Sequence, residues 1–173
     1  MATRQQVALT QKGNHEVGNL NSLKIKTVAH GAVVEGADID NFLQVELGFN
    51  ADGERTCKVL SDLTKKSYLI ASPEVRNLGV GEELVDFYNA IGEHARIVVQ
   101  EEGYTRFDTS AFTGTPVVGK VAYFDPATKK YVIVDSADAT YATAKAKFLV
   151  VSNEEDIEYT CGKPTVRLEV VEA

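Results

Sequence analysis

Short β-type segments, each followed by turn residues, recur along the chain, and this spacing constrains the fold more than any other feature. In the first segment Leu23, Ile25 and Thr27 alternate with lysines, which is the period of a half-buried strand. Candidate strands lie at 23–34, 42–49, 55–60, 67–71, 95–100, 104–108, 117–124, 130–135, 147–152 and 165–171. About ten short strands separated by turns predict a mainly β fold, with a single β-barrel or sandwich-like body.

Two hairpins are predicted from the turn residues between neighbouring strands. Asn50-Ala-Asp-Gly-Glu54 connects one pair of strands, and Asp125-Pro126 suits a type I turn in the pair that spans 121–134. The first turn begins like a calcium-binding loop. Ser61, however, occupies the position where such a loop needs a bidentate carboxylate. We therefore interpret this segment as a hairpin turn.

One short helix is predicted between Gly81 and Ile91. Its apolar side chains form one stripe at helical spacing, and we expect this stripe to pack against the β body: Leu84, Val85, Phe87, Tyr88 and Ile91. Gly92 would end the helix. The alanine-rich stretch at 140–147 is a weaker candidate for a second short helix, because Thr140, Tyr141 and Thr143 have low helix propensity.

Residues 1–20 differ from the remaining 21–173, which form the predicted β-rich body. They are rich in Gln, Asn and Thr, and their few apolar residues follow no sustained period, so we expect an extended N-terminal arm. Residues 1–20 carry a formal charge of +1 and the rest of the chain −8. The candidate interface residues of this arm are Arg4, Gln5, Val7, Leu9, Lys12, Val17 and Leu20. The alternative is a strand or helix that folds back on its own domain.

Charge and hydropathy exclude several classes of function. A net charge of −7 and an isoelectric point near 5.0 disfavour binding to a nucleic-acid backbone. The N-terminal sequence lacks the apolar core of a secretory signal, and no apolar stretch is long enough for a membrane span, so we expect neither export by that route nor a membrane partner. Cys57 and Cys161 stand outside metal-binding spacings, which favours two buried, reduced thiols in a chain made in the cytoplasm.

The sequence contains no catalytic or cofactor-binding signature. No serine lies in a GxSxG motif, and His15, His30 and His94 have no metal-binding spacing. Gly79-Val-Gly81 begins like a dinucleotide fingerprint, but Leu84 replaces the third glycine. We assign no catalytic residue, no metal site and no cofactor, and we expect a protein that is not an enzyme.

Four segments of the middle of the chain resemble structural proteins of tailed-bacteriophage heads, in particular capsid decoration (cement) proteins: 58–76, 82–89, 106–112 and 119–126. The resemblance covers roughly residues 55–135. It implies a non-enzymatic component of the virion on the capsid exterior, made in the host bacterial cytoplasm. It also implies that the protein binds the shell of major capsid protein at its symmetry axes, most often as a homotrimer.

Two other functions fit the same sequence. A phage tail-tube or head-to-tail connector protein is the alternative within the structural class, because such proteins build rings through long hairpins. A small β-barrel enzyme or ligand-binding module with a dispersed site is the alternative from another class.

Overall fold

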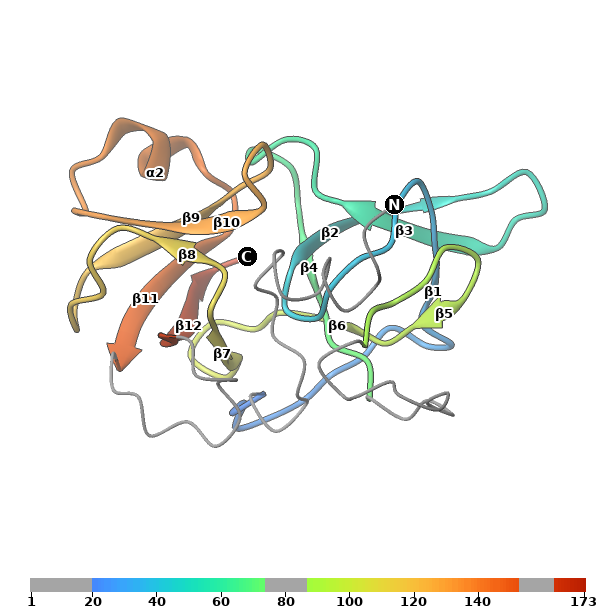
Figure 1. Ribbon diagram of the computed structural model, residues 1–173, viewed down its shortest axis with the longest axis horizontal. Helices are drawn as coiled ribbons and strands as arrows, with labels where there is room; N and C mark the ends of the chain where they lie inside the picture. Colours follow the sequence, from blue (N-terminus) through green and yellow to red (C-terminus); the bar gives the residue numbers. More distant parts are fainter. Residues whose placement is uncertain (1–19, 74–86, 153–163) are drawn as a thin grey trace.

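Two six-stranded sheets form the body of the protein in the computed structural model, which describes residues 20–73, 87–152 and 164–173 (Figure 1). The first sheet contains β1 (Ala32–Val34), β2 (Gln44–Phe49), β3 (Arg55–Val59), β4 (Tyr68–Ile70), β5 (His94–Ala95) and β6 (Ile97–Val98). The second contains β7 (Arg106–Thr109), β8 (Phe112–Thr113), β9 (Val121–Asp125), β10 (Lys130–Val134), β11 (Lys147–Ser152) and β12 (Val166–Glu172). The predicted mainly β class is confirmed.

The order of the strands leaves only short free edges. The first sheet runs β5-β1-β3-β2-β4-β6 and curls into half a barrel, and the second runs β7-β12-β11-β9-β10-β8. Three of the four edge strands, β5, β6 and β8, have two residues each, and the fourth, β7, has four. Short edges offer few unpaired backbone groups to another chain, which limits edge-to-edge aggregation.

Aromatic side chains fill the core between the two sheets. The Tyr131 ring lies 5.1–5.3 Å, centroid to centroid, from Phe107, Phe124 and Phe148. Phe42, which precedes β2 in the first sheet, stacks on Phe107 at 6.2 Å. All five rings are buried. Tilted and edge-on pairs at these distances stabilise a core beyond the area that they bury, so this cluster joins the sheets.

A buried hydrogen-bond network adds polar contacts between the sheets. The Tyr131 hydroxyl donates to the Phe42 carbonyl oxygen at 2.9 Å and accepts from Gln44 Nε2 at 2.8 Å. The side-chain oxygen of Gln44, Oε1, accepts from Ser67 Oγ at 2.7 Å and from Gln100 Nε2 at 2.6 Å. Burial raises the pKa of the Tyr131 hydroxyl well above its usual range, which keeps this group protonated.

Both predicted hairpins are confirmed. In the first, β2 pairs with β3 from Val45↔Val59 to Phe49↔Arg55. Asn50 closes its turn, because Oδ1 accepts from the backbone N–H of Asp52 and of Glu54. In the second hairpin β9 pairs with β10 over five residues, and the turn between them is largely exposed.

The predicted helix at 81–91 is wrong for residues 87–91, while residues 81–86 lie outside the described chain. Asn89 forms an isolated β-bridge with Ile39, with backbone hydrogen bonds in both directions, and its side chain donates to the Ile39 carbonyl oxygen and to Asn41. Ile91 is exposed, so the apolar stripe does not continue to it. An asparagine that finds such partners favours an extended backbone over a helical one.

The single helix of the described chain is α2 (Ala139–Thr143), which overlaps the first half of the weaker of the two predicted helical stretches, 140–147. The Asp138 side chain caps it by accepting from the N–H groups of Thr140 and Tyr141. The prediction of one long strand at 23–34 is also wrong. Only Ala32–Val34 is a strand there, and Leu23 and Ile25 are exposed because no sheet covers them.

Candidate functional site

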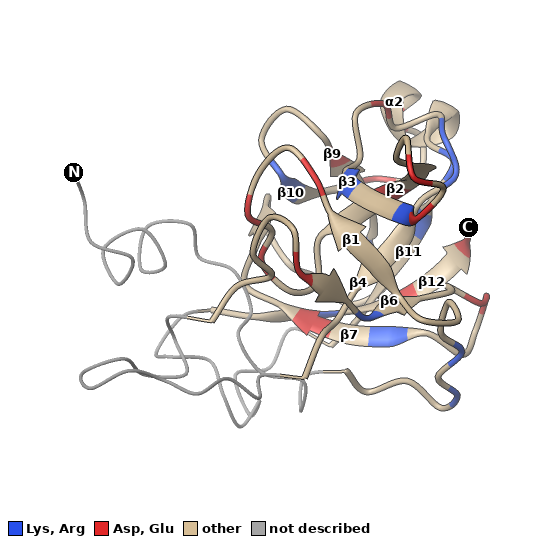
Figure 2. Ribbon diagram, turned by 90° about the vertical axis from the view of Figure 1, so that its right-hand side faces the viewer, with Lys and Arg blue, Asp and Glu red and all other residues tan. Residues whose placement is uncertain are grey.

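Two neighbouring strands at the edge of the second sheet carry a ladder of opposite charges. On β7 and β12, Arg106 lies opposite Glu169 and Asp108 lies opposite Arg167. These residues alternate with the fully buried Phe107 and Leu168, so the charged side chains share the other face of the sheet. Acidic and basic residues are seen to alternate along β7 in Figure 2. Each residue is paired across the strands with one of opposite charge.

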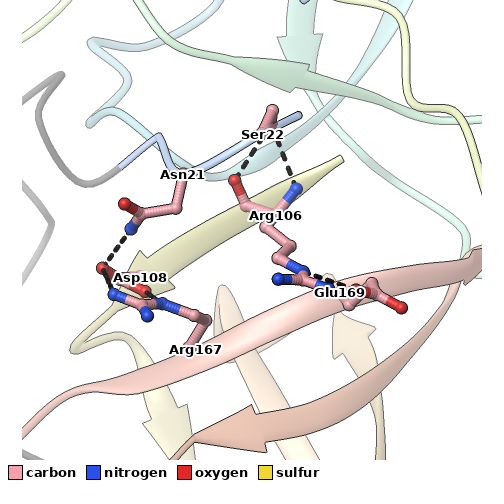
Figure 3. Close-up of polar contacts among 6 residues, drawn as sticks. All are labelled: Asn21, Ser22, Arg106, Asp108, Arg167 and Glu169. Carbon is pink, nitrogen blue, oxygen red and sulfur yellow. Dashed lines mark hydrogen bonds and ion pairs between the residues drawn. The ribbon is translucent and has the colours of Figure 1, made fainter. Parts of the chain in front are cut away.

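Asp108 is the most deeply buried member of this ladder. Its side chain is 1% exposed and accepts two hydrogen bonds from the Arg167 guanidinium, at 2.7 Å from Nε and 3.1 Å from Nη2. The amide of Asn21 donates a third hydrogen bond to the same carboxylate (Figure 3). A buried carboxylate is tolerated when its oxygens are paired in this way. Asp108 therefore links the start of the described chain to the last strand.

Residues 20–23, which we call the N-terminal root, also close the free edge of β7. The Ser22 hydroxyl donates to the Arg106 carbonyl oxygen and accepts from the Arg106 N–H, both at 3.0 Å (Figure 3). The Leu23 N–H donates to the Tyr104 carbonyl oxygen at 2.9 Å. Backbone groups of an edge strand that would otherwise bond to water or to another chain are thus satisfied within the molecule.

Of the candidate interface residues, only Leu20 lies within the described chain, and its side chain belongs to the hydrophobic core. The other six, Arg4 to Val17, lie outside the described residues. Sequence reasoning missed the residues that hold the root: Asn21, Ser22, Arg106, Asp108, Arg167 and Glu169. A usable signal was present, because Arg106-Phe-Asp108 and Arg167-Leu-Glu169 are complementary charge alternations in two candidate strands.

The geometry of this site is suited to holding the chain, not to chemical reaction. The Ser22 hydroxyl uses its proton and one lone pair on the Arg106 backbone, so no base activates it. Across the described ranges, no three His, Cys, Asp or Glu residues gather as metal ligands. His30 and His94 are exposed and His15 lies outside the described residues. Cys57 is a buried free thiol, as predicted, and burial raises its pKa to about 11.

A second polar cluster, which the sequence analysis did not identify, surrounds Glu46 on β2. Lys58 and Lys65 each place Nζ at 3.1 Å from its carboxylate, and Ser61 Oγ donates to it at 2.9 Å. Burial alone would raise the pKa of Glu46, but the hydrogen bonds from Lys58, Lys65 and Ser61 outweigh burial and lower the pKa to about 2. Lys65 Nζ also donates to Ser61 Oγ at 3.0 Å, and Ser61 in turn gives its proton to Glu46, so Lys65 acts on Ser61 as a hydrogen-bond donor and not as a base.

No helix in the part of the chain that the structure describes is long and apolar enough to cross a bilayer.

No solved structure is significantly similar to this chain. The family described as "YonC prophage protein" matches residues 11–171. The SPbeta prophage-derived uncharacterized protein YonC of Bacillus subtilis (strain 168) is 63% identical over 180 residues, an alignment that covers all of both chains. The chain therefore belongs to the YonC prophage protein family and has a phage origin.

Proposed function

We propose that this chain is a non-enzymatic structural protein of the phage particle, which binds the assembled capsid from outside as a decoration protein. In this proposal the N-terminal segment is the attachment element and the β body stays on the solvent side. The observation that carries it is the N-terminal root. Asn21 and Ser22 fix the start of the described chain to β7.

The charge distribution supports the same role. Residues 1–20 carry a net positive charge, from Arg4 and Lys12 against Glu16, whereas the rest of the chain is acidic. A basic segment on an acidic body would orient the body away from an acidic shell while the segment binds it. A fixed root also lowers the entropy lost on binding, because one end of the segment is already positioned.

The test is binding of the purified protein to capsids from a phage that lacks the gene. We expect the intact protein to cosediment with these capsids, and the variant lacking residues 1–19 to lose binding while its β body melts as before. The double variant Arg4→Glu, Lys12→Glu should bind at least about 10-fold more weakly. The matched control, Gln5→Ala with Gln6→Ala, leaves the charge unchanged and should bind normally.

Two results would reject the decoration function. One is absence of the protein from purified virions by mass spectrometry, and the other is capsid binding that is unchanged without residues 1–19. Finding the protein in the tail by cryo-electron microscopy would favour a tail-tube or connector protein instead. The projecting β2–β3 hairpin is the observation that favours this second candidate, because rings of tube proteins are built through hairpins.

A further inference from the structure

The β2–β3 hairpin carries an apolar face beyond the core of the protein. Val45, Leu47 and Phe49 share one face of β2, since side chains two residues apart point the same way. Val45 is fully buried, Leu47 is half-buried against the core, and Phe49 is 68% exposed. Figure 1 shows this hairpin extending outward at one end of the molecule. The face that is buried at the base of the hairpin is therefore uncovered at its tip.

The tip of the hairpin is preorganised. Phe49 pairs with Arg55 across the strands, and the guanidinium lies 5.5 Å from the centre of the Phe49 ring. The Asn50 side chain holds the turn between them through Asp52 and Glu54. Aromatic and arginine side chains on a rigid element are the residue types that dominate binding energy at protein interfaces.

A groove lies along the outer half of the same hairpin, and its lining includes Glu35, Leu47, Gly48, Thr56 and Phe49 itself. Gly48 lies close to its strand partner, because a Cβ at this position would lie only 3.3 Å from the Thr56 hydroxyl oxygen. The Glu46 carboxylate in the groove is already paired with Lys58. Glu35 is half-exposed and has no ion-pair partner within residues 20–73, 87–152 and 164–173, so it contributes a negative charge to the groove.

We propose that the occupant of this groove is the hairpin tip of a second copy of the same chain. Phe49 of one copy then covers Leu47 and Gly48 of the other, and Arg55, which has no ion-pair partner among the described residues of its own copy, pairs with Glu35. The complementarity of these two charges identifies the partner as the same chain. Because the tip and the groove belong to the same hairpin, the same patch serves on both copies, and the contact closes as a two-fold pair. This inference does not depend on capsid binding.

The experiment is analytical ultracentrifugation of the full chain over a concentration series, with variants of the two charges. We expect the wild type to self-associate, and Arg55→Glu or Glu35→Arg alone to weaken association at least about 10-fold. The double variant, with both charges exchanged, should restore association. Phe49→Ser should also weaken it, whereas Val118→Ser, which changes another exposed apolar residue outside the hairpin, should not.

Two outcomes would overturn the inference. The first is a wild type that remains monomeric up to about 100 μM, which corresponds to negligible affinity. The second is a double variant that associates no better than the single ones, since this would show that Arg55 and Glu35 do not meet. Circular dichroism melting of each variant separates loss of association from loss of folding. Association that persists when capsid binding fails would reject the proposed function alone.

Discussion

Replacing Tyr131 with Phe removes one oxygen atom from the contact between the two sheets. That oxygen donates to the Phe42 carbonyl oxygen and accepts from Gln44 Nε2. Phe42, Gln44 and Tyr131 are all fully buried, so water cannot replace the lost partner. The ring itself keeps its place among Phe107, Phe124 and Phe148, because Phe and Tyr have nearly the same shape.

The expected cost follows from the groups left behind. A buried donor or acceptor without a partner costs about 1–3 kcal/mol. The Phe42 carbonyl oxygen loses its hydrogen bond from the Tyr131 hydroxyl, whereas Gln44 Nε2 keeps a hydrogen bond of 3.3 Å to Gln100 Oε1. We therefore expect the full cost at Phe42 and part of it at Gln44, so Tyr131→Phe should lower the free energy of unfolding by about 2–4 kcal/mol.

Urea unfolding followed by far-ultraviolet circular dichroism measures this loss, with Tyr123→Phe as the matched control. Tyr123 lies on β9 and is only partly buried, so its variant should change stability by less than about 0.5 kcal/mol. We also expect the melting temperature of Tyr131→Phe to fall by about 5–12 °C. A loss below about 0.5 kcal/mol for Tyr131→Phe would refute the argument that this network joins the sheets.

Three further predictions concern stability. Asp108→Ala should lower the free energy of unfolding, measured in urea, by about 3 kcal/mol, because it leaves the Arg167 guanidinium without its buried partner. It should also expose residues 20–23 to limited proteolysis. Normal protection of these residues from the protease would contradict the prediction. Glu46 has a pKa lowered from 4.5 to about 2. Its stabilisation is therefore complete above about pH 4.5 and is lost as the pH falls towards 2. Its exposed lysine partners reduce this stabilisation to about 1–2 kcal/mol, and Glu46→Gln should abolish this part of the acid dependence of unfolding. Gly31→Ala should destabilise more than Gly36→Ala in thermal melts. Both glycines have positive φ, but only at Gly31 would a Cβ collide with the backbone, 2.2 Å from the Ala95 carbonyl oxygen; equal losses would show that the collision is relieved.

The sequence predicted strands best where turn residues bound a strongly β-prone run. The candidate at 147–152 coincides with β11, and both hairpins have their predicted turns. Two-residue strands such as β5 and β8 are too short to show a period, and partners far along the chain define them. The alternation at Leu23 and Ile25 predicted a buried face that the fold does not cover. Periodicity predicts which side chains share a face, and topology decides whether that face is buried.

The candidate site was less predictable than the fold. The sequence analysis placed the attachment function in residues 1–20, and all of these except Leu20 lie outside the described chain. It did not find Asp108 and Arg167, because their pairing depends on the register of β7 against β12, and these strands lie about 60 positions apart in the sequence. The third donor to this carboxylate, Asn21, comes from yet another distant part of the chain.

The same connectivity has a consequence for biosynthesis. Residues 20–23 leave the ribosome early, yet the carboxylate that holds Asn21 is oriented by Arg167 of the last strand. Contacts between such distant positions form late in folding, because a long loop must be closed first. The Asn21 contact is therefore complete only after β12 has been synthesised and paired, whereas the Ser22 and Leu23 contacts need only residues 104–106. A nascent or prematurely terminated chain would therefore hold its root by fewer contacts than the finished molecule.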